Sequence, residues 1–215
     1  MSELPRPSLP LFVFVSGKPG SGKTTLAQRL ADALWLPLVS NDAIRQGLFE
    51  TRAAARGEAA RLADVVDGPT AVGVFFSAIG FLLSAGVSLI ADHSFRRGLS
   101  EPDLRPLVQS ARLVNIHCDT LIEEAQRRFL QRERTQRRLF VEDLRRHRPE
   151  TFQRHDADYV VDQIERGAYD WTVFDPLDLD VPRLRVDTTG EYVPSLDRIV
   201  AFIRSASRDG SSRAP

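Results

Sequence analysis

Cysteine and lysine are nearly absent from this sequence. Cys118 is the only cysteine among the 215 residues, which excludes a disulfide framework and a cysteine-based zinc site and fits a reducing cytoplasm. Lysine occurs only as Lys18 and Lys23, because all other residues of the Lys-plus-Arg total are arginine. Two lysines close together therefore stand out against an arginine-rich background.

Net charge and a secretion signal are also missing. The 29 basic and 29 acidic residues balance, so no overall field gathers nucleic acid or an anionic membrane, and nucleic acid is not an expected partner. Residues 1–10 carry prolines and charges where a signal peptide needs an apolar run. We therefore expect a cytoplasmic protein, and the length fits one α/β domain.

One long uncharged run is present, at residues 70–91. It is long enough to imitate a membrane span. Gly86 divides it into a helix-like part at 71–85 and a strand-like part at 87–91, each of ordinary length. We expect a core helix followed by a core strand, with no membrane association.

A glycine-rich stretch carries the strongest motif. Residues 17–24, Gly-Lys-Pro-Gly-Ser-Gly-Lys-Thr, match the phosphate-loop (P-loop) pattern G-x-x-x-x-G-K-[ST] at every defined position. Residues 11–15 before it are typical of a buried strand, and residues 25–34 after it have apolar residues at helical spacing. The alternative is a glycine turn that binds nothing, but four fixed residues in this context make that interpretation the weaker one.

Each residue type of the motif has a chemical task. Backbone N–H groups of such a loop and the positive end of the next helix surround a nucleotide phosphate. Lys23 is expected to reach the β- and γ-phosphates, and the Thr24 hydroxyl to ligate Mg²⁺. Lys18 occupies a variable position and is expected to be solvated. The predicted nucleotide-binding residues of this stretch are Gly17, Gly20, Ser21, Gly22, Lys23, Thr24 and Thr25.

Strand-like and helix-like segments alternate along the rest of the chain, which predicts a parallel sheet with right-handed crossovers. The expected strands are residues 11–15, 35–39, 87–91, 112–117 and 184–186, and the expected helices are 25–34, one from 43, 71–85, 121–137, 157–166 and 195–203. Ser100 to Asp103 resembles a capping box for a helix through Val108. We expect a loose leader at 1–9, one domain at 10–204 and a flexible tail at 205–215.

Polar residues follow the predicted strands where ligands bind in such sheets. Asp42 and Arg45 follow the second strand, Asp92 closes the third, and Asp187-Thr188-Thr189 follows the fifth. Four arginines lie in the helix after the fourth strand, namely Arg127, Arg128, Arg132 and Arg134.

Together with the P-loop, this pattern resembles the P-loop metabolite kinases, a group that includes chloramphenicol phosphotransferase, gluconate and shikimate kinases and the polynucleotide 5′-kinase domain. The resemblance covers most of residues 11–203 and is weakest at 139–182. It implies a P-loop NTPase three-layer sandwich with five parallel strands in the order 2-3-1-4-5. It also implies an arginine-rich lid at about 121–155, with ATP and Mg²⁺ as cofactors.

The resemblance assigns a general base and a substrate contact. In similar kinases the Asp of the second-strand segment orients or deprotonates the acceptor hydroxyl, which is the role expected of Asp42. Helix capping is the alternative for Asp42, although Ser40 or Asn41 could cap instead. Arg45 is expected to grip an anionic or polar group of the substrate, or else to lie on an exposed helix face.

Asp92 is expected to hold Mg²⁺ directly or through water, or to contact substrate, with a turn cap as the alternative. His93 and Arg96 could line the acceptor pocket, although for His93 alone a structural role is slightly favoured over a catalytic one. Arg128 and Arg132 are four residues apart and could supply charge to the transferring phosphate, unless the helix is only a salt-bridged face.

Thr188 and Thr189 resemble the loop that passes the adenine in these kinases, a contact made mostly by backbone. The leading hypothesis is a kinase that uses ATP and Mg²⁺ to phosphorylate a hydroxyl of a small molecule, acting as a monomer or homodimer. Residues 43–86 are rich in Ala, Phe and Val, which favours an antibiotic-like or nucleoside-like acceptor, as in self-resistance or secondary metabolism.

Several alternatives stay open. The chain could be a polynucleotide or tRNA kinase, a zeta-toxin-like kinase of a sugar nucleotide, or a P-loop ATPase switch without an acceptor. A GTPase is disfavoured because the sequence has no N-K-x-D base-reading motif. An AAA-type motor is disfavoured because His93 stands after Asp92, where a catalytic glutamate is expected.

Overall fold

The computed structural model describes residues 9–56, 68–135 and 157–209. Three of the expected features lie partly outside the described residues: most of the leader, the second part of the lid, and the end of the tail.

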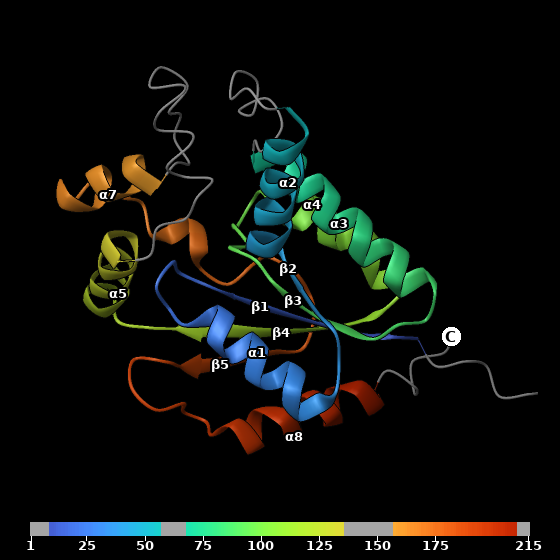
Figure 1. Cartoon of the computed structure of the whole chain (residues 1–215). Helices are drawn as coiled ribbons and strands as arrows, with labels where there is room; N and C mark the ends of the chain where they lie inside the picture. Colours follow the sequence, from blue (N-terminus) through green and yellow to red (C-terminus); the bar gives the residue numbers. More distant parts are fainter. Residues whose placement is uncertain (1–8, 57–67, 136–156, 210–215) are drawn as a thin grey trace, which may run out of the picture.

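Five parallel strands form one sheet in the order β2-β3-β1-β4-β5 (Figure 1). This confirms the predicted α/β fold and its strand order. The strands are β1 (Leu11–Gly17), β2 (Leu38–Ser40), β3 (Leu89–Asp92), β4 (Arg112–Asp119) and β5 (Arg183–Asp187). All seven residues of β1 are buried, because this strand lies at the centre of the sheet and both of its faces are covered.

Helices cover both faces of the sheet (Figure 1). On one face lie α1 (Lys23–Leu34) and α8 (Leu196–Asp209), and on the other lie α3 (Gly68–Ser84) and α4 (Glu101–Leu104). Helix α2 (Asn41–Arg56) packs on α3, and α5 (Ile122–Thr135) packs on α7 (Ala157–Glu165). Two short 3₁₀ helices, η2 (Arg105–Gln109) and η3 (Thr172–Phe174), complete the described elements.

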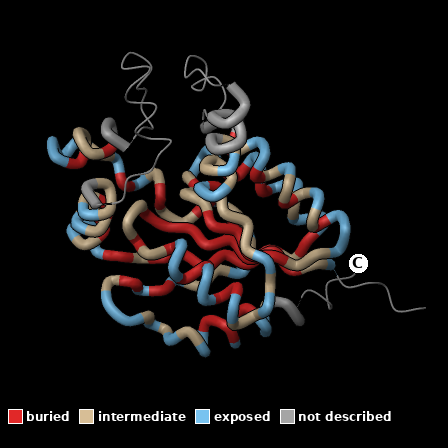
Figure 2. The backbone as a smooth tube through the Cα atoms, in the orientation of Figure 1, coloured by how far each residue is buried: buried red, intermediate tan, exposed pale blue. Residues whose placement is uncertain are grey.

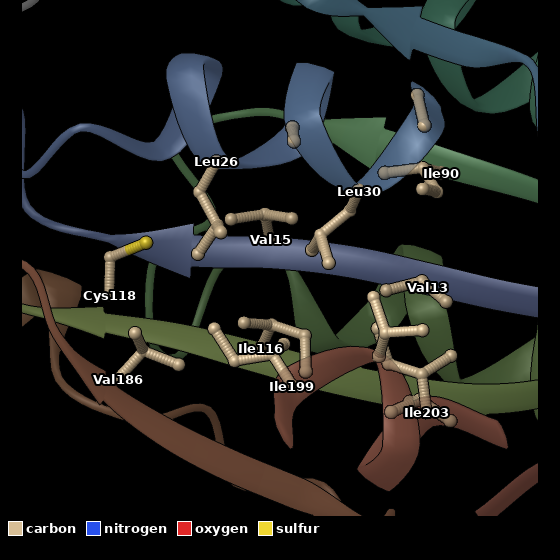
Figure 3. Close-up of a cluster of buried hydrophobic side chains, with 14 of the residues drawn as sticks. Val13, Val15, Leu26, Leu30, Ile90, Ile116, Cys118, Val186, Ile199 and Ile203 are labelled. Atoms are coloured by element: carbon tan, nitrogen blue, oxygen red, sulfur yellow. The ribbon is translucent and has the colours of Figure 1, made fainter. Parts of the chain in front are cut away.

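The side chains of β1 alternate between two buried clusters, as the two-residue repeat of a strand requires. Val13 and Val15 pack with Leu26 and Leu30 of α1 on the first face (Figure 3). Phe14 belongs to the second cluster, with side chains of α3 and β3. Figure 2 shows the buried residues concentrated along these central strands. Removing any of these side chains would leave a cavity, which is among the most destabilising changes a core can undergo.

The uncharged run at 70–91 forms a core helix and a core strand, as predicted. Helix α3 has 17 residues, and Gly86 lies between it and β3 with a φ of 80°, a conformation that favours glycine. Phe75 and Ile79 of α3 are fully buried against the sheet. Within the described parts of the chain, no helix is long and apolar enough to cross a membrane.

Three local predictions differ from the structure. The second strand is only Leu38–Ser40, because the chain first turns at Trp35, which has a left-handed φ of 56°. The capping box was wrong, because the Ser100 hydroxyl accepts a hydrogen bond from the Arg96 N–H instead of capping; the helical segment that follows is α4 and then the 3₁₀ helix η2, which includes Val108. Helix α8 continues to Asp209, so regular structure extends beyond residue 204, where the tail was expected to begin.

Candidate nucleotide and phosphoryl-acceptor site

The glycines of the P-loop are required by close backbone contacts. Gly17 and Gly20 have φ values of 132° and 79°, which other residues rarely adopt. A Cβ atom on Gly20 would lie 2.1 Å from the carbonyl oxygen of Ala125 at the start of α5. A Cβ atom on Gly17 would lie 2.3 Å from the carbonyl oxygen of Cys118 on β4. The loop is therefore held between the end of β4 and the first turn of α5.

Both lysines of the loop are buried. Lys23 Nζ donates a hydrogen bond to the backbone oxygen of Lys18 at 2.8 Å, which holds its ammonium group inside the curve of the loop. The expectation that Lys18 is solvated was wrong: it is 9% exposed, and its Nζ lies 3.6 Å from a carboxylate oxygen of Asp119. Asp119 also pairs with Arg185 of β5, so one carboxylate joins the loop to the edge of the sheet.

Lys23, Thr24 and Asp92 meet at the end of β1 and β3. Burial lowers the pKa of Lys23, while the nearby charge of Asp92 works in the opposite direction. Burial likewise raises the pKa of Asp92, although a hydrogen bond from the Thr24 side chain and the charge of Lys23 oppose that rise. Thr24 and Thr25 are exposed in the first turn of α1. The hydroxyl of Thr24 and the carboxylate of Asp92 are thus the oxygen ligands that Mg²⁺ prefers.

Asp42 lies close enough to this group for its charge to act on Lys23, Asp92 and His93. It is in the first turn of α2 and is exposed. The Ser40 hydroxyl accepts a hydrogen bond from the Ala43 N–H at 3.4 Å, which is the contact of a helix cap. Ser40 therefore performs the capping that was the alternative explanation for Asp42.

His93 lies among aromatic rings, with ring centroids 5.4 Å from Phe75 and 5.2 Å from Phe95. Burial lowers its pKa to about 4, so its imidazole is neutral at neutral pH. The charges of Arg45 and Arg96 also reach His93, which brings both predicted substrate-binding arginines to the same part of the molecule. The guanidinium of Arg96 also lies 6.0 Å from the ring centroid of Phe174.

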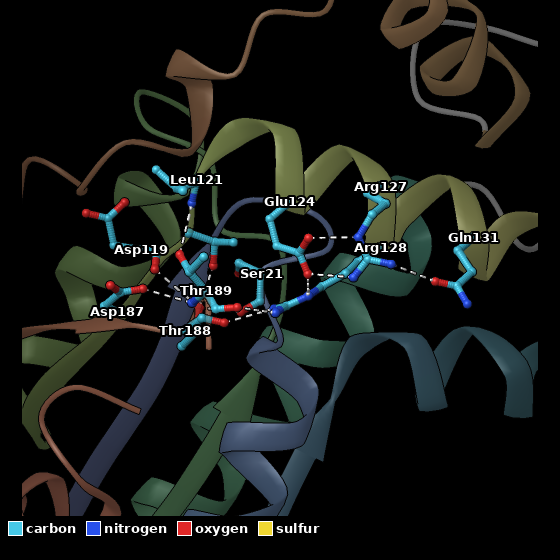
Figure 4. A network of polar contacts seen from close by, with 11 residues as sticks. Ser21, Asp119, Leu121, Glu124, Arg127, Arg128, Gln131, Asp187, Thr188 and Thr189 are labelled. Atoms are coloured by element: carbon cyan, nitrogen blue, oxygen red, sulfur yellow. Dashed lines mark hydrogen bonds and ion pairs between the residues drawn. The ribbon is translucent and has the colours of Figure 1, made fainter. Parts of the chain in front are cut away.

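The arginines of α5 have different surroundings (Figure 4). Arg128 donates hydrogen bonds to the backbone oxygens of Thr188 and Thr189, at 2.9 and 2.6 Å, and to Glu124. Hydrogen bonds from Arg127 and Arg128 hold the pKa of Glu124 at about 2. In this structure Arg128 thus connects α5 to the loop after β5.

Arg132 is the α5 arginine whose charge reaches the candidate site. That charge acts on both Lys23 and Asp92, and its guanidinium lies 5.4 Å from the ring centroid of Phe129. Arg132 also pairs with Glu133, at 3.3 Å. Of the two predicted catalytic arginines, Arg132 therefore lies electrostatically within the site and Arg128 is held at its border.

The side chain of Thr188 has a structural role that was not predicted. The sequence led us to expect contacts mostly from the backbone of this loop. Its hydroxyl donates to the backbone oxygen of Ser21 in the P-loop at 2.7 Å, and it also contacts the hydroxyl of Thr120 (Figure 4). The Thr188 N–H donates to the Asp119 oxygen at 2.9 Å. The Thr189 hydroxyl only accepts a 3.3 Å hydrogen bond from Leu121.

A chain of buried hydrogen bonds behind the P-loop was also missed. Asn115 Nδ2 donates to the Ser16 hydroxyl at 2.8 Å, and that hydroxyl lies 3.0 Å from His117 Nδ1. Arg183 Nε donates to the Asn115 side-chain oxygen at 3.1 Å. Polar residues at every second position of β4 were the signal available in the sequence, because such residues share one face of a strand.

The family of the chain follows from a comparison with family models. A model described as an AAA domain matches residues 12–158, which include the P-loop and every predicted catalytic residue. The chain belongs to this family. The match continues through α5 and reaches the start of α7.

Solved structures similar to this AAA-domain protein include several kinases. A candidate kinase from Chloroflexus aurantiacus has a TM-score of 0.66 and 26% sequence identity, with 94% of this chain and 98% of that chain covered. A sugar kinase from Janibacter sp. has a TM-score of 0.54 and 19% identity, covering 91% and 95% of the two chains. A gluconokinase from Sinorhizobium meliloti has a TM-score of 0.50 and 16% identity, covering 96% and 99%.

No curated protein sequence matches the chain. The structural matches and the family match confirm the predicted resemblance to the P-loop small-molecule kinases and the P-loop NTPase fold. The matches that are less than 25% identical support the fold alone.

Proposed function

We propose that the protein is a kinase that transfers the γ-phosphate of ATP to a hydroxyl group of a small molecule. The observation that carries this proposal is the placement of Lys23, Asp92 and Asp42 after the carboxyl ends of β1, β3 and β2, close enough for the charge of Asp42 to act on both Lys23 and Asp92. Phosphoryl transfer requires positive charge at the transferring group and an acceptor for the hydroxyl proton. Lys23 would supply the first and Asp42 the second.

The residues of the site fit ATP and Mg²⁺. The backbone N–H groups of the P-loop and the first turn of α1 would surround the phosphates, with Lys23 leaving its internal bond to the Lys18 oxygen for a phosphate oxygen. Thr24 and Asp92 would hold Mg²⁺, which commonly keeps several waters and takes only one or two protein ligands. When bound, Mg²⁺ would neutralise charge on the transferring phosphate.

Asp42 would orient the acceptor hydroxyl and take its proton. Its exposure leaves the carboxylate open to an acceptor, and the capping of α2 is performed by Ser40. Arg132, whose charge reaches Lys23, would add positive charge from α5. Water exclusion by α5 would limit wasteful hydrolysis of ATP.

The surroundings of His93 support an acceptor with an apolar body. Phe75, Phe76 and Phe95 form an aromatic group with the neutral His93 ring, while Arg45 and Arg96 supply charge near its border. An acceptor site next to this aromatic group would suit a nucleoside-like or antibiotic-like acceptor better than a small sugar acid, which would need several charged partners.

A screen of ATP consumption with Mg²⁺ tests this proposal. The acceptor panel contains nucleosides, aminoglycosides, chloramphenicol-like amides, sugars and a 5′-hydroxyl oligonucleotide, with the phosphorylated product identified by mass. A small-molecule product supports the proposal and names the acceptor class. A product on the oligonucleotide alone would favour a polynucleotide kinase, and nucleotide binding without any product would favour a P-loop switch.

The substitution Lys23→Ala tests the role of the P-loop. We expect product formation to fall to background while the far-ultraviolet circular dichroism spectrum stays that of the wild type, because Lys23 Nζ donates its hydrogen bond to the backbone of its own loop. Arg29→Ala is a matched control, because Arg29 is an exposed cation on the same helix whose guanidinium lies 5.3 Å from the Tyr192 ring centroid. A folded and active Lys23→Ala protein would contradict the proposed role of Lys23 in phosphoryl transfer.

A further inference from the structure

One buried polar side chain near the site has no hydrogen-bonding task in the described fold. Asn41 is 3% exposed, and within the described residues its nitrogen Nδ2 is buried without a hydrogen-bond partner. It does not act as the helix cap, because the Ser40 hydroxyl makes the 3.4 Å bond to the Ala43 N–H. A buried amide donor without an acceptor is destabilising, so native proteins contain few and each needs an explanation.

The position of Asn41 points to the proposed acceptor site. Asn41 begins α2 directly after β2, and the preceding Ser40 pairs in register with Asp92 of β3. Asp42 is the next residue, and Arg45 lies one helical turn further on the same face as Asn41. The charges of both Asp42 and Arg45 reach His93. The amide therefore lies at the corner of the sheet where the acceptor would meet its base.

We propose that Asn41 binds the acceptor, with Nδ2 donating a hydrogen bond to an oxygen atom other than the hydroxyl that is phosphorylated. This inference rests on the proposed kinase function. Asp42 would hold the reacting hydroxyl, and the amide of the preceding residue would hold a second oxygen atom of the same small molecule. The substrate class is then a compound with more than one oxygen substituent, such as a diol or a hydroxy-carbonyl compound.

The variant Asn41→Leu tests this role, because leucine has a similar volume and removes the amide without adding charge. Asn115→Leu is the matched control, because the Asn115 amide donates to the Phe14 oxygen at 3.1 Å and to the Ser16 hydroxyl at 2.8 Å. We expect the melting temperature without ligand to stay the same or rise in Asn41→Leu, because a buried donor without a partner is removed. We expect it to fall in Asn115→Leu, which loses these two bonds and the one that Arg183 donates to the Asn115 side-chain oxygen.

Kinetics with two probes, D-gluconate and uridine, give the second readout, since both carry vicinal hydroxyls. With a probe that the wild type phosphorylates, Asn41→Leu should lower kcat/KM for that probe about tenfold, mainly through KM, and should leave the KM for ATP within about twofold. An unchanged KM for the probe would overturn the proposal. A lower melting temperature together with an unchanged KM would assign Asn41 to the structure.

Failure of this inference can be separated from failure of the proposed function. If the wild type binds MgATP but phosphorylates neither probe nor any acceptor of the panel, the kinase proposal fails. The melting temperature then decides the role of Asn41. If the melting temperature of Asn41→Leu falls as much as that of Asn115→Leu, the Asn41 amide is structural and the inference is overturned. An unchanged or higher melting temperature supports an amide donor that is kept for a ligand.

Discussion

Proton transfer in the proposed reaction depends on the carboxylate of Asp42. Its charge reaches both Lys23 and His93, so a neutral replacement changes the site as well as removing a base. Because Ser40 caps α2 through its own hydroxyl, such a replacement should leave the helix in place.

We therefore expect Asp42→Asn to lower kcat by roughly 10²-fold or more, which is the usual contribution of a general base. The melting temperature should change little. Steady-state kinetics at saturating ATP would measure the effect, and Ser40→Ala would be the control, with a lower melting temperature and a nearly normal kcat. A loss of less than about threefold in Asp42→Asn would return this residue to a structural role.

Cys118 offers a simple test of burial at the residue scale. It is fully buried beneath α1, and burial raises its pKa to about 12. Only the thiolate reacts readily with alkylating reagents, so the folded protein should not react with iodoacetamide at pH 8. The thiol should become fully reactive in 6 M guanidinium chloride. Rapid labelling of the folded protein, measured by mass, would contradict the position of β4 next to the P-loop.

The sequence could predict the positions of residues that a motif defines. It could not predict the surroundings of residues that contact distant parts of the chain. Lys23 begins α1 directly after the P-loop and Asp92 ends β3, as predicted, while their roles stay predictions. The burial of Lys18 could not be predicted, because it depends on Asp119 of β4, which is far away in the sequence. Asn41 was considered only as a cap, since nothing in the sequence shows that its amide is buried.

At the scale of elements, the loop after β5 connects three parts of the site. The Thr188 hydroxyl donates to the Ser21 oxygen at 2.7 Å, and Arg128 of α5 donates to the Thr188 and Thr189 oxygens. The P-loop, the end of β5 and α5 are thus joined by hydrogen bonds that include one buried hydroxyl. A disturbance at Thr188 should therefore affect both stability and nucleotide binding.

We expect Thr188→Val, which keeps the shape of the side chain, to lower the free energy of unfolding by about 1–3 kcal/mol, because the Ser21 oxygen loses its buried donor. The KM for ATP should also rise. Urea unfolding and steady-state kinetics would measure the two effects. Thr189→Val is the control, since its hydroxyl makes one long, exposed bond of 3.3 Å and its loss should cost less than about 1 kcal/mol. Equal effects in both variants would contradict this account.

Sequence patterns located most elements but not their tertiary contacts. The division of residues 70–91 at Gly86 was correct, because a left-handed glycine separates α3 from β3. Ser100 was misjudged as a cap, since its hydroxyl instead accepts from the Arg96 N–H in the preceding turn. For Arg128 the helical spacing predicted a face shared with Arg132, but could not reveal the carbonyl oxygens on the loop after β5 to which Arg128 donates.

For the whole molecule, two buried histidines make stability depend on pH. Burial lowers the pKa of both His93 and His117 from 6.5 to about 4. Between these values the unfolded chain binds more protons than the folded one, so each histidine contributes stability that is present above pH 6.5 and lost as the pH falls towards 4. Asp92, whose pKa is raised by burial, acts in the opposite direction.

A variant that removes one histidine isolates this effect. In His93→Phe, where the new ring would lie among Phe75 and Phe95, the loss of unfolding free energy between pH 7 and 4.5 should be about 2 kcal/mol smaller than in the wild type. Urea unfolding at both pH values would measure it. An identical pH dependence in the two proteins would mean that His93 titrates normally and is not held neutral.

The order of the strands was predictable because right-handed crossovers and a family resemblance leave few topologies. An AAA-type motor was disfavoured for a different reason, because His93 follows Asp92 where the catalysis of a motor needs a glutamate. The family described as an AAA domain matches residues 12–158 regardless of that position. Residue patterns therefore predicted the fold, and the family match shows the family to which the chain belongs.

The contact between Gly20 and the first turn of α5 gives the protein a natural optical reporter. Ala125 and Phe129, whose backbone atoms lie against Gly20, belong to the same buried cluster as Trp171. The other tryptophan, Trp35, is 94% exposed at the far end of α1. In a Trp35→Phe protein, the fluorescence of one buried indole would thus follow any displacement of α5 that accompanies loading of the phosphate loop.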